Sequence, residues 1–221
     1  MTTAIPDPDR ADVVTPDADG VSPLEGGGRV LLVACGALAH EILHLKRING
    51  WDHLDLACLP AILHNRPDRI PDAVHAVVTR NSSEYDRVCV VYADCGTGGA
   101  LQRLCDRLGV EMIRAPHCYA FFEGVDSFIE RDEMTAFYLT DFLVRQFDAF
   151  VWRPLGLDRH PELHDAYFGH YEALVYLAQS EDPALTQQAA DHAQRLGLRF
   201  ERRKTGYGEL ATTLEQWASQ D

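Results

Sequence analysis

The chain has 221 residues, 46% of them hydrophobic, and a formal net charge of −14. This length predicts one domain, and no apolar run reaches the roughly 18 residues that a membrane helix needs. The acidic balance argues against a nucleic-acid partner, because phosphate binding needs clustered Lys and Arg. Without a basic and apolar leader the chain is expected to be cytoplasmic, where its six cysteines would stay reduced.

The first 28 residues have a composition of their own. They carry many acidic side chains against one arginine, Arg10, with several prolines and a closing run of glycines. Such a segment buries too little apolar surface to offset its ordering entropy, so residues 1–28 are predicted to be a disordered acidic tail. A single α/β domain is predicted over residues 29–221.

From residue 30 onward, strand-like and helix-like segments alternate. Strands are predicted at 30–35, 54–60, 87–94 and 110–115, and helices at 38–49, 70–82 and 99–109. Further helices are predicted at 132–146, 161–180, 183–196 and 207–219, with weaker strand patterns at 147–152 and 198–203. The alternation predicts a three-layer, doubly wound α/β fold, with a mostly parallel sheet, helices on both faces and a helical C-terminal half.

Three cysteines, Cys35, Cys95 and Cys118, each fall where a predicted strand breaks into a turn. Because parallel strands end at the same edge of a sheet, the three thiols are expected to meet around one crevice. They would suit a zinc ion with an open position or an iron–sulfur cluster, and the sequence does not separate these two. His117 is an alternative ligand to Cys118, and also a candidate catalytic group. The competing interpretation is that the thiols are small buried apolar side chains, as is expected of Cys58, Cys89 and Cys105.

The turn after the third strand is the strongest single motif, Asp94-Cys95-Gly96-Thr97-Gly98-Gly99. Backbone amides in a glycine-rich turn that leads into a helix point toward anions, so Gly96, Thr97, Gly98 and Gly99 are predicted to bind a small anionic ligand. The turn lacks the lysine of a P-loop and the GxGxxG spacing, which argues against the usual nucleotide sites. The alternative is a tight turn that needs glycine for its backbone alone.

The first predicted helix contains His40-Glu41-Ile42-Leu43-His44, which matches the HExxH pattern of zinc peptidases, with His64 as a candidate third ligand. A position in the first helix of a parallel α/β unit argues against a peptidase. Glu41 is retained as a candidate catalytic residue, because it is close enough to Cys35 to enter the crevice as a ligand or proton carrier.

Three segments, CGALAHE at 35–41, YADCGTGG at 92–99 and PHCYAFFEG at 116–124, carry a resemblance to a known family. The chain resembles the domain of unknown function 1638 family over Arg29 to about Gly208. The resemblance implies a setting near corrinoid-dependent methyltransferases, where thiolate-held zinc activates methyl acceptors and iron–sulfur proteins reactivate cobalt.

The sequence therefore predicts a zinc or iron–sulfur protein of corrinoid-linked one-carbon metabolism, built on a cysteine-rich crevice and an anion-binding turn. Whether it is a methyltransferase-type enzyme is left open. The alternative is a non-catalytic accessory protein that delivers a metal or cofactor to a corrinoid protein or methyltransferase. A plain binding module with structural cysteines is the third interpretation.

Overall fold

The computed structural model describes residues 30–220, so the predicted acidic tail at 1–28 lies outside the described residues. The strands are β1 (Val30–Cys35), β2 (Leu54–Leu59), β3 (Arg87–Val91), β4 (Glu111–Met112), β5 (Ala136–Thr140), β6 (Ala173–Ala178) and β7 (Arg199–Lys204). The helices are α1 (Ala39–Asn49), α2 (Ile70–Asn81), α3 (Ala100–Leu108), α4 (Ala120–Glu123), α5 (Val125–Arg131), α6 (Asp141–Arg145), α7 (His164–Phe168), α8 (Pro183–Arg195) and α9 (Gly208–Ser219). Short 3-10 turns are η1 (Gly36–Leu38), η2 (Ala61–Asn65), η3 (Pro67–Arg69) and η5 (Pro161–Leu163).

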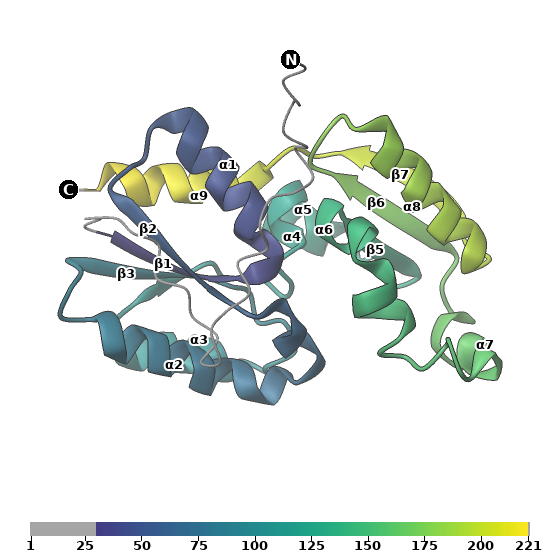
Figure 1. The fold of residues 1–221 in the computed structure, drawn as a ribbon, viewed down its shortest axis with the longest axis horizontal. Helices are drawn as coiled ribbons and strands as arrows, with labels where there is room; N and C mark the ends of the chain where they lie inside the picture. The colour runs from purple at the N-terminus through teal and green to yellow at the C-terminus, as the bar shows by residue number, and fades with distance from the viewer. Residues whose placement is uncertain (1–29, 221) are drawn as a thin grey trace, which may run out of the picture.

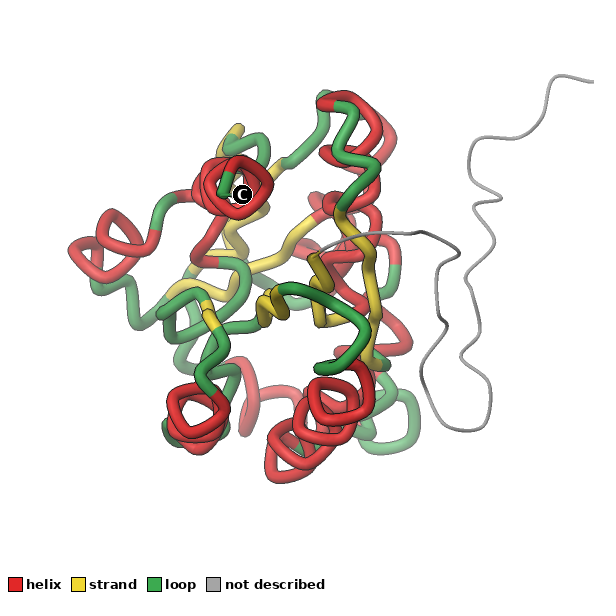
Figure 2. The backbone as a smooth tube through the Cα atoms, turned by 90° about the vertical axis from the view of Figure 1, so that its left-hand side faces the viewer, coloured by secondary structure: helices red, strands yellow, loops and turns green. Residues whose placement is uncertain are grey.

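The first four strands form one parallel sheet in the order β2-β1-β3-β4. The helices α1 and α9 lie on one side of this sheet and α2 and α3 on the other (Figure 1). Figure 2 shows the same three layers from the end, with helices on both sides of the strands. We call this part the first lobe. It confirms the predicted α/β fold with a parallel sheet and helices on both faces.

Burial on both faces explains why the first lobe's strands read as continuous apolar runs. Every residue of β1 is buried, and β3 is buried at all positions after Arg87. A parallel sheet that is covered on both sides selects Val, Leu and Cys at successive positions rather than alternating polar residues. The apolar runs therefore predicted these strands: β1 and β2 lie within one residue of the predicted bounds, whereas β3 ends three residues before the predicted end and β4 forms only at Glu111–Met112 of the predicted 110–115.

The remaining strands form a second parallel sheet in the order β5-β6-β7, which we call the second lobe together with α6, α7 and α8. It has a hydrophobic core of its own, with Leu139, Phe147 and Tyr176 fully or almost fully buried. The prediction of one domain over 29–221 remains a prediction.

The second lobe corrects three predicted segments. The predicted helix at 132–146 contains β5, and the predicted helix at 161–180 contains β6. The predicted strand at 147–152 falls on η4 (Asp148–Trp152), a π-helix. Short apolar runs such as ALVYLA fit a buried helix and a buried strand equally well, and only pairing with β5 and β7 makes this one a strand.

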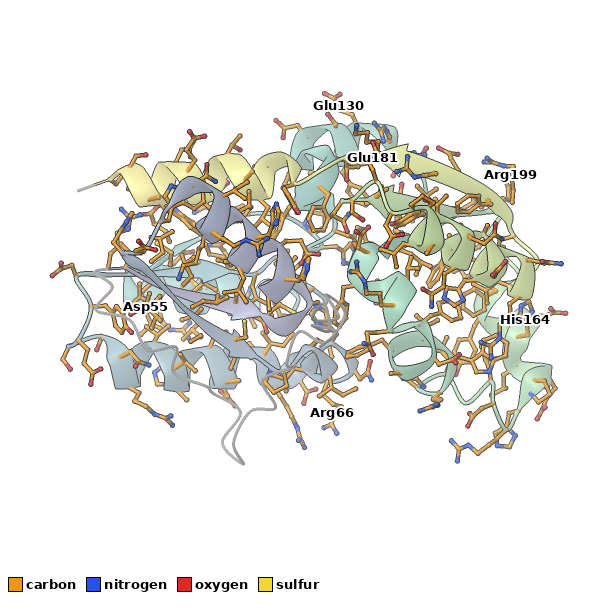
Figure 3. All side chains as sticks on the ribbon, turned by 45° about the horizontal axis from the view of Figure 1, so that its top comes forward. Asp55, Arg66, Glu130, His164, Glu181 and Arg199 are labelled. Carbon is orange, nitrogen blue, oxygen red and sulfur yellow. The ribbon has the colours of Figure 1, made fainter. Side chains whose placement is uncertain are left out.

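The carboxyl ends of the two sheets point toward each other. Asp55, near the amino end of β2, lies at the outer end of the first lobe, whereas Arg199, at the amino end of β7, lies at the opposite end of the molecule (Figure 3). Glu181, just beyond β6, lies between the lobes (Figure 3). Consistently, η1 after β1 contacts α6 after β5. Ligands of parallel α/β sheets bind at carboxyl edges, so this junction is where a functional site is expected.

A ring contact and the path of the chain also connect the lobes. The ring of Tyr119, from the loop before α4, stacks on Tyr138 of β5 at 5.4 Å. After β7 the chain returns to the first lobe as α9, whose Leu210, Leu214 and Trp217 are buried in the first lobe's core. Among residues 30–220, no helix is long and apolar enough to cross a membrane.

Candidate metal centre

Each strand of the first sheet is followed by one soft side chain. Cys35 ends β1, His64 lies in η2 after β2, Cys95 follows β3, and Cys118 follows β4. The sheet is doubly wound, because the chain runs from β1 outward to β2 on one side and from β3 outward to β4 on the other. The crevice beyond β1 and β3 is therefore a topological switch point, the usual ligand site of such sheets.

Backbone pairing beyond the ends of β3 and β4 brings two of the sulfurs together. The amide of Asp94 donates to the carbonyl of Ala115 at 2.9 Å, and the amide of Cys95 donates to the carbonyl of Pro116 at 3.0 Å. This pairing continues the register between β3 and β4. As a result the Sγ atoms of Cys95 and Cys118 lie 3.1 Å apart in a buried environment.

A close approach of the turns after β1 and β2 positions His64. A Cβ atom at Gly36 would lie 3.0 Å from the carbonyl oxygen of Leu59, so glycine is needed for η1 to rest against the end of β2. Across this contact the Sγ of Cys35 lies 3.7 Å from Nδ1 of His64. The same Nδ1 lies 3.0 Å from the carbonyl oxygen of Ala61.

One group of three side chains has the spacing of a metal site. The ligand atoms of His64, Cys95 and Cys118 all lie within 4.8 Å of one another, and it is the one such group found among residues 30–220. Cys35 lies beside this group, next to the imidazole, rather than in it. An Nδ1–H bond to a backbone carbonyl, here Ala61, is the usual way in which proteins orient a ligating histidine and leave Nε2 for the ion. The residues present could therefore hold a metal ion.

The electrostatics of the group favour thiolate formation at one sulfur. The hydrogen bond from Cys118 is the largest cause of a lowered pKa at Cys95; burial opposes it, and the hydrogen bond and charge of His64 add to the lowering, which brings the pKa to about 5. Burial works to lower the pKa of His64, but hydrogen bonds to the Cys35 and Cys95 sulfurs and their charge raise it to about 11. The hydrogen bond to Cys95, followed by burial, raises the pKa of Cys118 well above its usual range. The three side chains thus act strongly on one another, and the shifts favour a negative charge at Cys95 and a positive charge at His64.

Tyr92 adds an unused polar atom beside these sulfurs. Its side chain is fully buried, and its hydroxyl forms no hydrogen bond of ordinary geometry among the described residues, although the Cys35 sulfur lies close enough to act on its pKa. Burial raises its pKa well above the usual value, and the charges of Cys35 and Cys118 add to the effect. Its ring stacks on His64 at 6.4 Å. A buried hydroxyl without a partner is costly, and a ligand bound at the sulfurs would offer one.

The glycine-rich turn already holds an anion, the carboxylate of Asp94. This side chain accepts hydrogen bonds from Gly99 N at 2.6 Å, from Thr97 Oγ1 at 2.8 Å and from Gly98 N at 3.1 Å. The sequence predicts that Gly96, Thr97, Gly98 and Gly99 bind an external anion, and three of these four residues donate to Asp94 instead. The prediction of a small anionic ligand therefore remains a prediction, and binding at this turn would require displacing Asp94.

The two predicted catalytic residues lie outside the group. His117 is exposed, and its ring stacks on Tyr119 at 4.9 Å. Glu41 is only 2% exposed, and its Oε2 has no hydrogen-bond partner among the described residues. Burial raises the pKa of Glu41 to about 7, and the nearby Asp141 of the second lobe adds to this increase. Glu41 therefore lies at the junction between the lobes.

The HExxH motif does not form a group of three ligands in the described part of the chain. His40 is exposed, while His44 lies 3.1 Å from Arg47 and its ring packs on Tyr207. His64, considered at first as a third ligand to this motif, instead joins Cys95 and Cys118. The signal that could have identified it is its place just after β2, which matches the place of each cysteine after its own strand.

The fold and the group together define a two-lobed α/β protein with a buried sulfur and imidazole cluster at a sheet edge. The chain belongs to the family described as protein of unknown function (DUF1638), which matches residues 58–214. His64, Cys95 and Cys118 all lie inside the matched span, whereas Cys35 and Glu41 precede it. No curated protein and no solved structure matches the chain.

Proposed function

We propose that this protein binds one zinc ion through His64, Cys95 and Cys118. The observation that carries the proposal is the convergence of these three ligand atoms within 4.8 Å of one another at the edge of the first sheet. Three protein ligands of this kind leave a fourth position for water or substrate, as in catalytic zinc sites. Cys35 and Ala61 hold the imidazole through Nδ1 and act as positioning groups rather than ligands.

The spacing favours a single ion over an iron–sulfur cluster. In a tetrahedral zinc site with Zn–S bonds of about 2.3 Å, two sulfurs lie about 3.8 Å apart. The 3.1 Å separation of Cys95 and Cys118 is close to this value, so a small opening of the pair admits one ion. An iron–sulfur cluster is ordinarily held by four thiolates, whereas this group offers two thiols and one imidazole. Zinc is therefore the metal we assign.

We place the reaction in corrinoid-linked one-carbon metabolism, as the family resemblance implies. Bound zinc would supply Lewis-acid chemistry, lowering the pKa of a thiol or water at its open position. The chain's own groups shape that position: Tyr92 offers a buried hydroxyl, and the buried cysteines exclude bulk water. Desolvation of this kind favours activation of a small thiol as a methyl acceptor.

A second candidate is an accessory protein that delivers metal to a methyltransferase. It is favoured by burial, since Cys95 and Cys118 are each only 8% exposed. Such a protein would pass its zinc to a partner and catalyse nothing. In the proposed enzyme a bound small thiol would instead enter the coordination sphere, which a cobalt-substituted protein reports through its visible absorption.

Metal analysis of matched variants tests the proposal. Anaerobically purified protein is loaded with zinc, dialysed and analysed for metal, alongside Cys95→Ser, Cys118→Ser and His64→Asn. One zinc per wild-type chain and loss of the metal in all three variants are expected. Cys105→Ala, a change in the buried face of α3 outside the group, should keep the metal. Retention of zinc by all three ligand variants would refute the site.

A further inference from the structure

Two sulfurs of the first lobe lie closer together than the roughly 3.8 Å of a tetrahedral zinc site. The Sγ atoms of Cys95 and Cys118 are 3.1 Å apart and both side chains are reduced. A disulfide bond is about 2.05 Å long, so a shift of about 1 Å would join them. The two residues are joined by backbone hydrogen bonds through Asp94–Ala115 and Cys95–Pro116, which hold them in place before any oxidation.

The backbone at Cys95 is unusual as well. Cys95 has φ = 46°, one of two non-glycine residues with positive φ among the described residues. A side chain in this left-handed region is strained, and such strain persists at functional sites where the surrounding structure over-determines it. The turn continues from Cys95 through Gly96 and Gly98, both of which are exposed.

We propose that Cys95 and Cys118 form a reversible dithiol–disulfide pair that reduces small hydroperoxides. The Cys95 sulfur attacks the distal peroxide oxygen, the O–O bond breaks, and the alcohol or water leaves with a proton, giving a sulfenic acid on Cys95. The Cys118 sulfur then attacks the Cys95 sulfur, an S–S bond forms, and water leaves with the Cys118 proton. Two thiols lose two electrons and two protons, and the hydroperoxide gains them.

The surroundings fit both steps. His64 has a ring nitrogen within 4.8 Å of both sulfurs, so its imidazole lies beside the sulfur that attacks and the sulfur that is attacked. The low exposure of both cysteines restricts the oxidant to a small molecule such as hydrogen peroxide. Because these sulfurs are also the proposed zinc ligands, oxidation and metal binding exclude each other, so an oxidant would release the ion.

The test uses the full-length chain, reduced and freed of metal by a chelator. It is treated with hydrogen peroxide, and non-reducing peptide mapping by mass spectrometry follows the products. We expect loss of two thiols, a peptide cross-linked through Cys95 and Cys118, and full reversal by dithiothreitol. In Cys118→Ser, the sulfenic acid should persist on Cys95 and be trapped by dimedone. Cys105→Ala should form the same cross-link as the unaltered protein.

Two results would overturn the inference: absence of a cross-link between Cys95 and Cys118 in the unaltered chain, or equal labelling of all cysteines. The deciding result, the presence or absence of the cross-link, is measured on the unaltered protein. It therefore does not depend on whether a variant folds. A separate zinc titration of the reduced protein keeps the two proposals apart. Cross-linking without zinc binding would uphold this inference and reject the metal site, and zinc binding without cross-linking would do the reverse.

Discussion

The carboxylate of Asp94 accepts a 2.6 Å hydrogen bond from the amide of Gly99, so the glycine-rich turn closes on its own side chain. Gly98 N and Thr97 Oγ1 donate to the same carboxylate. This turn fixes the backbone that carries Cys95. Its stability should therefore respond to Asp94 more strongly than to any external anion.

Replacing Asp94 with Ala should lower the free energy of unfolding by about 1–2 kcal/mol, because three donors lose a charged acceptor. Burial works to raise the pKa of Asp94, but hydrogen bonds from Thr97, Gly99 and Gly98 outweigh it and lower the pKa. The contribution is thus complete above the usual pKa of 3.8 and is lost as the pH falls through the lower folded value. Urea unfolding at several pH values checks this, and a constant difference from pH 7 to pH 2 would contradict it.

The return of the chain to the first lobe depends on Gly208. A Cβ atom at Gly208 would lie 2.3 Å from the carbonyl oxygen of Phe122 and 2.5 Å from that of Phe121. We expect Gly208→Ala to displace α9 and to lower the free energy of unfolding by about 3 kcal/mol or more. Gly206→Ala is the matched control, since φ is also positive there but no atom lies within 4 Å of the added Cβ. Gly206→Ala should lower the free energy of unfolding by only about 1 kcal/mol. Equal destabilisation of the two variants in thermal unfolding would show that the close approach at Gly208 has no effect.

Glu41 should give the folded protein a distinct pH dependence. Burial raises its pKa from 4.5 to about 7, so the folded state binds a proton more tightly than the unfolded state. Between these two values stability should fall as the pH rises, by roughly 3 kcal/mol at most. Glu41→Gln has no carboxyl group to ionise, so its stability relative to the unaltered protein should increase over this range. Chemical denaturation at several pH values gives the free energy of unfolding of both proteins. If the two proteins show the same dependence on pH, the Glu41 carboxyl does not have a raised pKa in the folded state.

Cys35 should act on the metal site only through His64. Its sulfur contacts Nδ1, the nitrogen that the proposed zinc site does not use. Removing such a supporting contact typically weakens metal binding by about 10-fold to 100-fold without abolishing it. Cys35→Ser should accordingly keep one zinc per chain with reduced affinity in a competitive chelator titration. Complete loss of zinc, equal to that in Cys118→Ser, would show instead that Cys35 is a ligand.

The first lobe was predictable because its strands are buried on both faces and end in recognisable turns. Cys95 and Cys118 were placed at one edge from sequence alone, since parallel strands share their carboxyl edge. His64 was not assigned to this group, because it lies in η2, with four residues between it and the end of β2, and only the packing of Gly36 against Leu59 brings it inward.

The second lobe was less predictable. Its strands β5 and β6 are short apolar runs whose periodicity does not separate a strand from a buried helix. The hydrogen bonds within the glycine-rich turn were also not predictable. Nothing in the spacing of Asp94, Gly98 and Gly99 shows that the amides of the turn donate to the Asp94 carboxylate. Contacts within the turn decide this, and sequence patterns do not report them.

X-ray absorption at the zinc edge of the metal-loaded protein reports which atoms are bound to the ion. We expect two sulfur atoms at about 2.3 Å and one imidazole nitrogen at about 2.0 Å, with a light atom completing the shell. One sulfur should disappear in Cys118→Ser. A first shell of oxygen and nitrogen alone, or a shell unchanged by that substitution, would contradict the assignment of His64, Cys95 and Cys118 as ligands.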